Sequence, residues 1–315
     1  KPQLSLSRPR SSAERFPAAS DYPAFPPRRE IMARRHQALL LLAAVASVLC
    51  EKAATGKGSL DYYGYYSSID PSAVDDDLKG QLQVLTANHK VFEYDDVWAI
   101  FASVDQLLPT YPCDTNSSHI PDVYSSYCWD PEQNQVTGGE CGNYKKEGDC
   151  FNREHLWPKS WFGGFDQGQN AQTDLFELWP SDGYVNGLRG NLPFGDVDPA
   201  TVKYTSSSGC LIGDCVSSEY DGECFEPSAS MKGDFARSYF YLSTTYWNAW
   251  ACCDTDSVNG SDIKPWMETV MRDWHAADPV DDYERQRNDA IYLNWQLNRN
   301  PFIDHPEWVD QISDF

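Results

Sequence analysis

The chain has 315 residues and carries 47 acidic and 25 basic side chains, a formal net charge of −22 at pH 7. Residues 1–50 hold eight of the Lys and Arg but only three of the Asp and Glu, so the remainder carries about −27. Such acidity favours solubility and opposes nonspecific adhesion to nucleic acid, because phosphate contacts normally draw on Lys and Arg.

The N-terminal region divides into two segments. Residues 1–31 are rich in proline and precede the first methionine, Met32, so we interpret them as disordered polypeptide or translated upstream sequence. Residues 32–50 contain two arginines followed by an apolar run of about 12 residues, the pattern of a secretory signal peptide. Because this run is shorter than the roughly 20 residues that span a bilayer, we expect a secreted protein without a membrane anchor.

Nine cysteines follow Cys50. In an exported protein they indicate disulfides, and the sequence lacks the paired CxxC spacing that would favour a zinc site. Their odd number leaves one thiol over, and we expect the adjacent Cys252 and Cys253 to bond to different partners. Two glycosylation sequons, which begin at Asn116 and Asn259, fit a glycoprotein and predict surface loops.

Residues 60–315 are expected to form one domain, since about 250 residues can bury one sizeable core. Apolar residues at helical spacing predict amphipathic helices over residues 68–90 and 93–106. His89, near the end of the first helix, is expected to be a solvated residue without a functional role. Residues 109–150 show little periodicity, which favours two short strands with long, disulfide-held connections.

Residues 151–196 hold the side chains that indicate chemistry. The segment FNREHLW is short and ends at Pro158, so we expect a strand on which Glu154 and His155 point to opposite faces. A bulge or bend would have to re-aim one of them if both serve one cluster of metal and water. The alternative is a solvated carboxylate beside a hydrogen-bonded core imidazole.

The segment PSDGYVNGLRGN, residues 180–191, predicts a helix of two to three turns with Ser or Asp as N-cap and Gly as C-cap. At 100° per residue, Asn186 and Arg189 share a face, whereas Asn191 points elsewhere and is interpreted as a backbone-capping residue. Gly187 costs about 1 kcal/mol of helix stability relative to alanine, which indicates close packing on the strand or against phosphate. A base, oxygen ligands and a cation together suit metal-assisted phosphodiester hydrolysis.

The C-terminal part reads as a loop followed by helices. Residues 210–224 are expected to form a loop closed by one disulfide. Helices are predicted over residues 232–250, 262–278 and 278–298, the last with an acidic capping box. His275, at the end of the second of these helices, suits the negative pole of the helix. For the basic group of Arg285, Arg287 and Arg299, a solvated or salt-bridged face is the preferred interpretation and phosphate contact the alternative.

Five segments, in order, resemble the endonuclease I family of secreted ββα-metal nucleases: NREHLWPKSWF, DLFELWPSDGYVNGLRGNLPFG, KGDFARSYFYLS, DPVDDYERQRN and NRNPFIDHPEW. The resemblance covers roughly residues 62–308. It implies a mainly helical, single α+β domain around a ββα-metal core with a small antiparallel sheet. The implied activity is cleavage of DNA, and often of RNA, with little sequence preference and 5′-phosphate products.

The resemblance also assigns roles to individual residues. By position, the general base falls on His155, and the metal ligands fall on Glu154 and Asn186. Where many members have a histidine and an asparagine after DL, this chain has Phe176 and Glu177. We expect this pair to support the site rather than perform chemistry.

A second departure concerns phosphate. The loop of residues 163–173 lacks the arginine with which some members bind phosphate, so this role is expected to pass to Arg189 or Arg153, with Arg189 preferred. Together with Asn191, these two arginines make up the expected substrate-contacting set.

The resulting hypothesis is a monomeric nuclease that acts on DNA, with RNA as a second substrate. Glu154 and Asn186 would hold one hydrated Mg²⁺, with Ca²⁺ or Mn²⁺ as alternatives, because ligands that are all oxygen disfavour thiophilic metals. His155 would deprotonate a water, and Arg189 would neutralise a phosphate oxygen. Two other readings stay open: a secreted phosphodiesterase for small substrates, which suits the acidic surface, and a non-catalytic extracellular glycoprotein on a nuclease scaffold.

Overall fold

The centre of the fold is a pair of strands followed directly by a helix. In the computed structural model, β3 (Phe151–His155) pairs antiparallel with β4 (Leu178–Asp182), and α4 (Gly183–Arg189) begins at the next residue. The strands pair residue for residue from one end to the other, with no extra residue in either. The bulge that we expected near Glu154 and His155 is therefore not present, and the two side chains keep the opposite orientations of a regular strand.

The structure describes residues 64–105, 119–130, 141, 143–163, 170–250 and 253–315.

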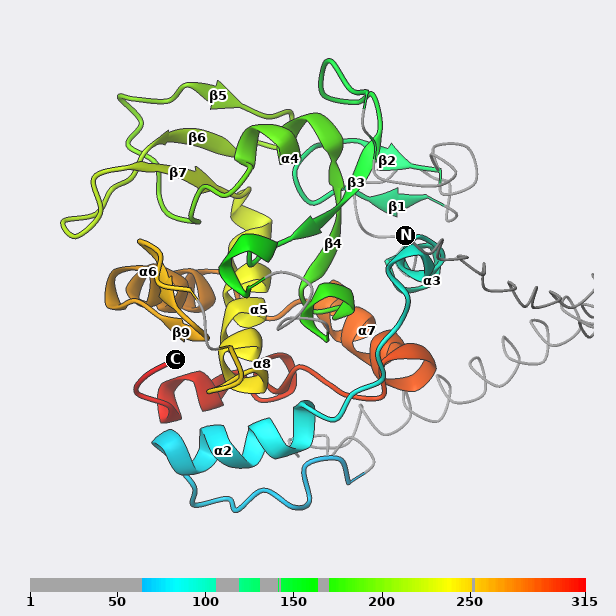
Figure 1. The fold of residues 1–315 in the computed structure, drawn as a ribbon, viewed down its shortest axis with the longest axis vertical. Coiled ribbons are helices and arrows are strands. Elements are labelled where there is room, and N and C mark those ends of the chain that lie inside the picture. Colours follow the sequence, from blue (N-terminus) through cyan, green and yellow to red (C-terminus); the bar gives the residue numbers. More distant parts are fainter. Residues whose placement is uncertain (1–63, 106–118, 131–140, 142, 164–169, 251–252) are drawn as a thin grey trace, which may run out of the picture. The chain divides into compact units, whose positions relative to one another are not determined.

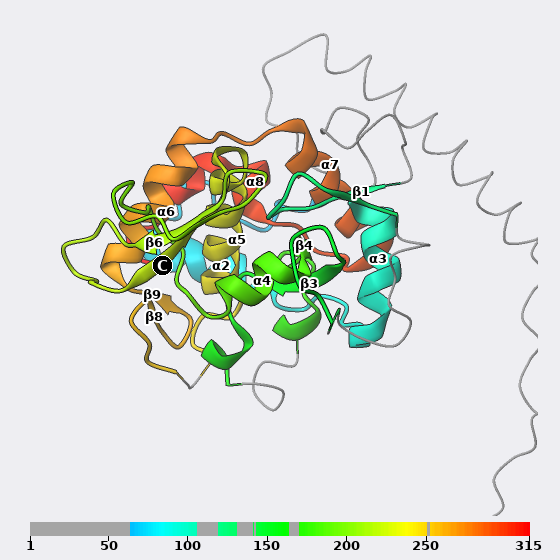
Figure 2. The same ribbon diagram turned by 90° about the horizontal axis from the view of Figure 1, so that it is seen from above.

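The two faces of this strand pair are buried against different apolar clusters. Phe151 and Leu178 pack with Val97 and Phe101 of α3 (Val97–Val104) in a small cluster. Trp179 belongs to the main core, which is built around α5 (Lys232–Thr245). Figures 1 and 2 show α3 and α5 on opposite sides of β3 and β4. Burial on both faces fixes the register, because a slip of one residue would exchange the faces of every side chain.

The helix α5 is buried around its whole circumference, and α2, α6 and α8 lie against it (Figure 1). The helices predicted from apolar spacing are confirmed, including the capping box in which Asp281 and Glu284 exchange side-chain to backbone hydrogen bonds. The helical elements apart from α3, α4 and α5 are α2 (Asp75–Thr86), η1 (Tyr94–Asp96), η2 (Lys159–Trp161), η4 (Ala171–Thr173), η5 (Ala229–Met231), α6 (Pro265–Ala277), α7 (Asp282–Ala290), the π-helical turn η6 (Ile291–Trp295), α8 (Pro301–Asp304) and η7 (Pro306–Gln311).

The remaining strands are short and antiparallel. The loop expected over residues 210–224 is wrong in part, because this segment contains β6 and the start of β7, which pair with each other. Short strands of this kind show no clear alternation in sequence. The strands outside the central pair are β1 (Ile120–Pro121), β2 (Cys128–Trp129), β5 (Tyr204–Thr205), β6 (Leu211–Asp214), β7 (Glu223–Glu226), β8 (Val258–Asn259) and β9 (Asp262–Ile263). The architecture is thus α+β, mainly helical, with small antiparallel sheets.

Disulfides close two of the connections. Cys141 bonds to Cys150 and Cys215 to Cys224, while Cys210 is a buried free thiol. The second bond is the one expected within residues 210–224. Two further cysteines, Cys128 and Cys253, are also disulfide-bonded. The signal peptide over residues 32–50, the segment before it and the sequon at Asn116 also lie outside the described part of the chain, whereas Asn259 is exposed at the turn between β8 and β9.

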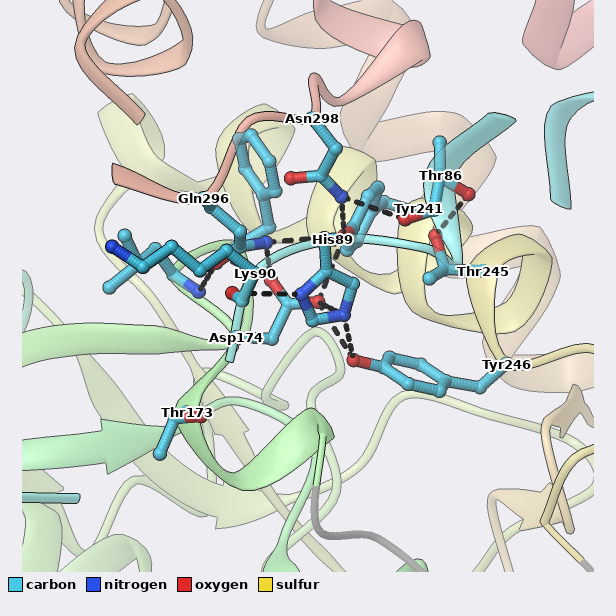
Figure 3. A network of polar contacts seen from close by, with 12 residues as sticks. Thr86, His89, Lys90, Thr173, Asp174, Tyr241, Thr245, Tyr246, Gln296 and Asn298 are labelled. Atoms are coloured by element: carbon cyan, nitrogen blue, oxygen red, sulfur yellow. Dashed lines mark hydrogen bonds and ion pairs between the residues drawn. The ribbon is translucent and has the colours of Figure 1, made fainter. Parts of the chain in front are cut away.

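Two predictions about polar residues have different outcomes. His89 is buried rather than solvated, with Nε2 3.1 Å from the Tyr246 hydroxyl and 3.5 Å from Asp174 Oδ2 (Figure 3). The prediction was wrong because α2 ends at Thr86 and the His89 side chain, beyond the helix, points into the core while its neighbours Asn88 and Lys90 are exposed. Arg287 and Arg299 are buried in ion pairs with carboxylates, as the salt-bridge interpretation predicted.

Among the helices that the structure describes, none combines the length and apolarity needed to cross a membrane.

Candidate active site

The position of α4 is set by its two ends. Asp182 is the N-cap, and its side chain accepts a hydrogen bond of 2.9 Å from the Val185 N–H. Gly190 ends the helix with φ +52°, a conformation that L side chains rarely adopt. The close approach expected at Gly187 is real but its partner is Tyr144, since an added Cβ would lie 2.3 Å from the Tyr144 hydroxyl oxygen. These features fix the helix against the strand pair.

Glu154 is buried, with 2% of its surface exposed, and it is held through one oxygen. Its Oε1 accepts hydrogen bonds of 2.7 Å from the Tyr124 hydroxyl and from Arg189 Nη1. Burial raises the pKa of Glu154 above its ordinary value, and the Arg189 guanidinium and the Tyr124 hydroxyl oppose this rise. Both hydrogen bonds end on Oε1, which leaves the lone pairs of Oε2 available to a cation.

Arg189 lies at the last position of α4 and is 1% exposed. Besides Glu154, its guanidinium donates to three backbone carbonyl oxygens: Nη1 to His155 at 2.9 Å, Nη2 to Leu156 at 2.7 Å and Nε to Leu192 at 3.1 Å. Its hydrogen-bonding capacity is therefore directed into the protein. This geometry favours a role in holding Glu154 and the end of β3 over the direct phosphate contact expected from the sequence.

Asn186 lies on the same side of the strand pair as Glu154. Its Nδ2 donates to Ser181 Oγ at 3.3 Å, and Ser181 is opposite Asn152 in the β3–β4 register. Asn152 and Glu154 are two positions apart and so share a face of β3. The structure thus brings the two expected metal ligands, one on a strand and one on the helix, to one face.

The donors on this face fit a hard divalent cation. Glu154 Oε2 and Asn186 Oδ1 are oxygen atoms with no hydrogen bond from any described residue, and Asn186 is only partly buried. Magnesium is commonly held by one or two protein oxygens and keeps several of its waters. Within the described ranges there is no cluster of three or more His, Cys, Asp or Glu side chains suited to a metal.

His155 lies on the opposite face and is 7% exposed. Its ring stacks on Tyr94 with centroids 5.9 Å apart, and Nε2 lies 3.4 Å from the Tyr94 hydroxyl, while Phe162 covers the ring at 6.2 Å. Burial, and then the positive charges of Lys159 and Arg153, lower the pKa of His155 well below its usual range. The imidazole is therefore neutral near pH 7, the form that can accept a proton.

The two residues that depart from the family pattern face different surroundings. Phe176 packs on Tyr241 in the main core, with ring centroids 4.7 Å apart. Glu177 is fully buried and its Oε1 lies 3.5 Å from His155 Nδ1. Burial raises the pKa of Glu177 well above its usual range, and a hydrogen bond from the Trp157 N–H opposes this rise. Glu177, and not Phe176, therefore lies next to His155, the proposed general base.

Two further residues of the expected substrate-contacting set lie elsewhere. Arg153 is buried with its guanidinium over the Tyr94 ring at 3.5 Å and over the Trp98 ring at 4.5 Å. Asn191 is exposed and its Nδ2 donates to Ser160 Oγ at 3.0 Å. The interpretation of Asn191 as a backbone cap is wrong, because its side chain links the end of α4 to the turn that follows β3.

Tyr94 and Tyr124, which contact His155 and Glu154, were not predicted as site residues. They lie 61 and 30 residues before their partners in the chain. No local spacing indicates such contacts, and only the tertiary packing of the preceding segments on the two faces of β3 creates them.

Comparison with known proteins gives the same family by independent means. The model of the family described as Endonuclease I matches residues 75–307. The chain is 33% identical over 252 residues to an extracellular ribonuclease of Bacillus subtilis (strain 168), which covers 79% of this chain and 77% of that protein. An extracellular ribonuclease of Bacillus amyloliquefaciens is 33% identical over 239 residues, 75% of this chain and 73% of that protein. An extracellular deoxyribonuclease of Aeromonas hydrophila is 26% identical over 142 residues, 45% and 53% of the two chains.

Proposed function

Because the chain belongs to the endonuclease I family and is a nuclease, we propose that it hydrolyses phosphodiester bonds of both DNA and RNA and leaves 5′-phosphates. Relatives named for ribonuclease and for deoxyribonuclease activity support the two substrates. The proposal includes little sequence preference, since a nuclease that acts on the backbone needs no contact with base edges.

The observation that carries the proposal is the arrangement of β3, β4 and α4. Glu154 on β3 and Asn186 on α4 each offer, on one face, an oxygen that accepts no hydrogen bond from a described residue. The neutral imidazole of His155, the last residue of β3, points to the other face, so the proposal places the scissile phosphate at the end of the strand, where it can meet both. We assign the two oxygens to one Mg²⁺ in a ββα-metal core. When bound, the ion would stabilise the charge that develops on the phosphate and on the leaving oxygen.

The chemistry assigned to the protein is one proton transfer. His155 Nε2 accepts a proton from a water, and the water oxygen attacks phosphorus in line with the bond to the 3′-oxygen. That bond breaks, the phosphate stays on the 5′-oxygen of the downstream nucleotide, and the released 3′-oxygen takes a proton from solvent. Nε2 is the nitrogen assigned to this step because Nδ1 faces Glu177 inside the protein.

A basic residue other than Arg189 is needed to contact the substrate phosphate. Arg189 is buried and bonded to Glu154, so we assign it to holding the metal ligand in place. Lys159 is less buried and lies over the Tyr94 ring at 5.0 Å, beside His155. We propose Lys159 as the cation that meets the substrate, which would supply a local attraction within an acidic chain of net charge −22.

The proposal also includes secretion of the protein from the cell. Relatives named as extracellular, the disulfides and the exposed sequon at Asn259 support a secreted glycoprotein. Disulfides form and persist in oxidising compartments, which agrees with export.

The test is a substrate panel for the purified, oxidised chain at low salt. Supercoiled plasmid, single-stranded RNA and a small model diester are incubated with Mg²⁺, Mn²⁺ or Ca²⁺, and in parallel with EDTA. We expect metal-dependent cleavage of both polymers, 5′-phosphate ends and a strong preference over the small diester. Equal rates on the diester would favour a small-substrate phosphodiesterase, and no cleavage with any of the metals would favour a non-catalytic protein.

A further inference from the structure

The proposed base has a buried neighbour of its own. His155 Nδ1 and Glu177 Oε1 lie 3.5 Å apart, and neither atom has a hydrogen-bond partner among the described residues. Leaving two buried polar atoms unpaired costs folding free energy, because each has lost its hydrogen bonds to water. A closer approach of a few tenths of an ångström with better alignment would pair the two atoms, and catalytic hydrogen bonds often tighten in this way when substrate binds.

We propose that Glu177 is a positioning residue for His155: its carboxylate accepts Nδ1–H and thereby directs Nε2 toward the attacking water. The catalytic consequence rests on the proposed function, whereas the contact and the tautomer do not. A neutral imidazole has one N–H donor and one acceptor, so fixing the proton on Nδ1 leaves Nε2 as the acceptor.

Glu177 is held in place through its backbone and its carboxylate. Its carbonyl oxygen accepts from the Leu156 N–H at 3.2 Å, and its Oε2 accepts from the Trp157 N–H at 3.1 Å. These two donors are the residues that directly follow His155. Glu177 therefore extends the pairing of β3 and β4 by one residue and presents Oε1 to the imidazole. The Trp157 N–H on Oε2 opposes the rise in the pKa of Glu177 that burial causes, and Oε1 keeps its lone pairs for a hydrogen bond from Nδ1–H.

The segment before Glu177 is anchored in the core by Asp174. The Asp174 carbonyl oxygen accepts from the Glu177 N–H at 3.0 Å, which sets the turn that delivers Glu177 to its position. Figure 3 shows the Asp174 carboxylate surrounded by polar side chains. It accepts from the hydroxyls of Tyr241 at 2.8 Å and Tyr246 at 2.9 Å and from Gln296 Nε2 at 2.8 Å. This network makes the turn rigid, and a rigid support is what a positioning residue needs.

The decisive variants are Glu177→Leu, which removes both acceptor oxygens, and Glu177→Gln, whose single oxygen cannot accept from both the Trp157 N–H and Nδ1–H. Phe176→Leu is the matched control, because it alters the adjacent buried residue on the side that faces Tyr241. Long-range proton–nitrogen NMR of the ring, assigned with a His155→Gln sample, reports the tautomer without any assay of activity. Steady-state cleavage of plasmid at saturating Mg²⁺ gives kcat and KM.

We expect the Nδ1–H tautomer in the wild type and a mixture of tautomers in Glu177→Leu. In Glu177→Gln we expect the Nε2–H tautomer, because the oxygen stays with the Trp157 N–H and the amide NH2 then faces Nδ1. In Glu177→Leu and in Glu177→Gln kcat should fall by about tenfold or more with KM nearly unchanged, whereas Phe176→Leu should lose stability and keep kcat. The inference is overturned if the wild type carries its proton on Nε2, a result that needs no variant to fold. It is also overturned if Glu177→Leu keeps both the tautomer and kcat. A wild type without activity but with the Nδ1–H tautomer would refute the proposed function and retain the contact.

Discussion

The guanidinium of Arg189 donates to the carboxylate of Glu154 over 2.7 Å, and both side chains are almost completely buried. This ion pair ties the end of α4 to β3 and orients the oxygen that is proposed to face the metal. A buried charge that loses its partner is strongly destabilising, because its desolvation is no longer compensated.

Replacing Arg189 therefore tests its assignment as a structural cation. We expect Arg189→Ala to lower the free energy of unfolding by about 3–5 kcal/mol, because Glu154 would stay buried without its partner. Urea denaturation followed by circular dichroism measures this change, with the exposed Arg285→Ala as a control expected within about 0.5 kcal/mol of the wild type. An Arg189→Ala protein as stable as the wild type, with only KM raised, would return Arg189 to phosphate binding.

Asn186 is predicted to act through the metal. In Asn186→Ala we expect the Mg²⁺ concentration for half-maximal cleavage to rise about tenfold or more, with activity recovering at high Mg²⁺ and thermal stability nearly unchanged. The exposed Leu188→Ala on the same helix is the control and should leave the Mg²⁺ dependence as it is. If both variants shift the dependence alike, the effect comes from the helix and not from a ligand.

The stability of the fold should depend on pH through His275. Burial, followed by the Arg237 guanidinium, lowers the pKa of His275 to about 4, whereas an unfolded histidine titrates near 6.5. Because the folded pKa is the lower one, the neutral imidazole's contribution is fully present above about 6.5 and is lost as pH falls toward 4. The free energy of unfolding of the wild type, relative to His275→Gln, should therefore decrease between pH 7 and pH 4.5. Parallel curves for the two proteins over this range would contradict the assignment.

The local parts of the site could be predicted from the sequence because their signals are local. Pro158 after a short mixed segment predicted β3, and the cap residues at Asp182 and Gly190 predicted α4. The spacing of Asn186 and Arg189 placed both on one helix face. The helical period could not predict that Arg189 pairs with the Glu154 carboxylate, because this contact depends on how closely α4 packs on the strands.

The parts that could not be predicted depend on contacts that are distant in the sequence. Tyr124 reaches Glu154 from a segment with little periodicity, and Tyr94 reaches His155 from the start of a helix on the other face of the strands. His89 is another case, because the sequence does not show whether a side chain just beyond a helix end points into the core or into solvent. Glu177 was recognised as a departure, but only the antiparallel pairing of the two strands places it beside His155.

The central claim is that His155 is the general base of a nuclease. The most direct measurement is the single-turnover rate of plasmid cleavage in Mg²⁺ by the wild type and by His155→Ala, with His305→Ala as a matched control and circular dichroism to confirm the fold. The account predicts a loss of about a hundredfold or more in His155→Ala, unchanged DNA binding and a normal rate in His305→Ala. A folded His155→Ala protein that cleaves at close to the wild-type rate would contradict it.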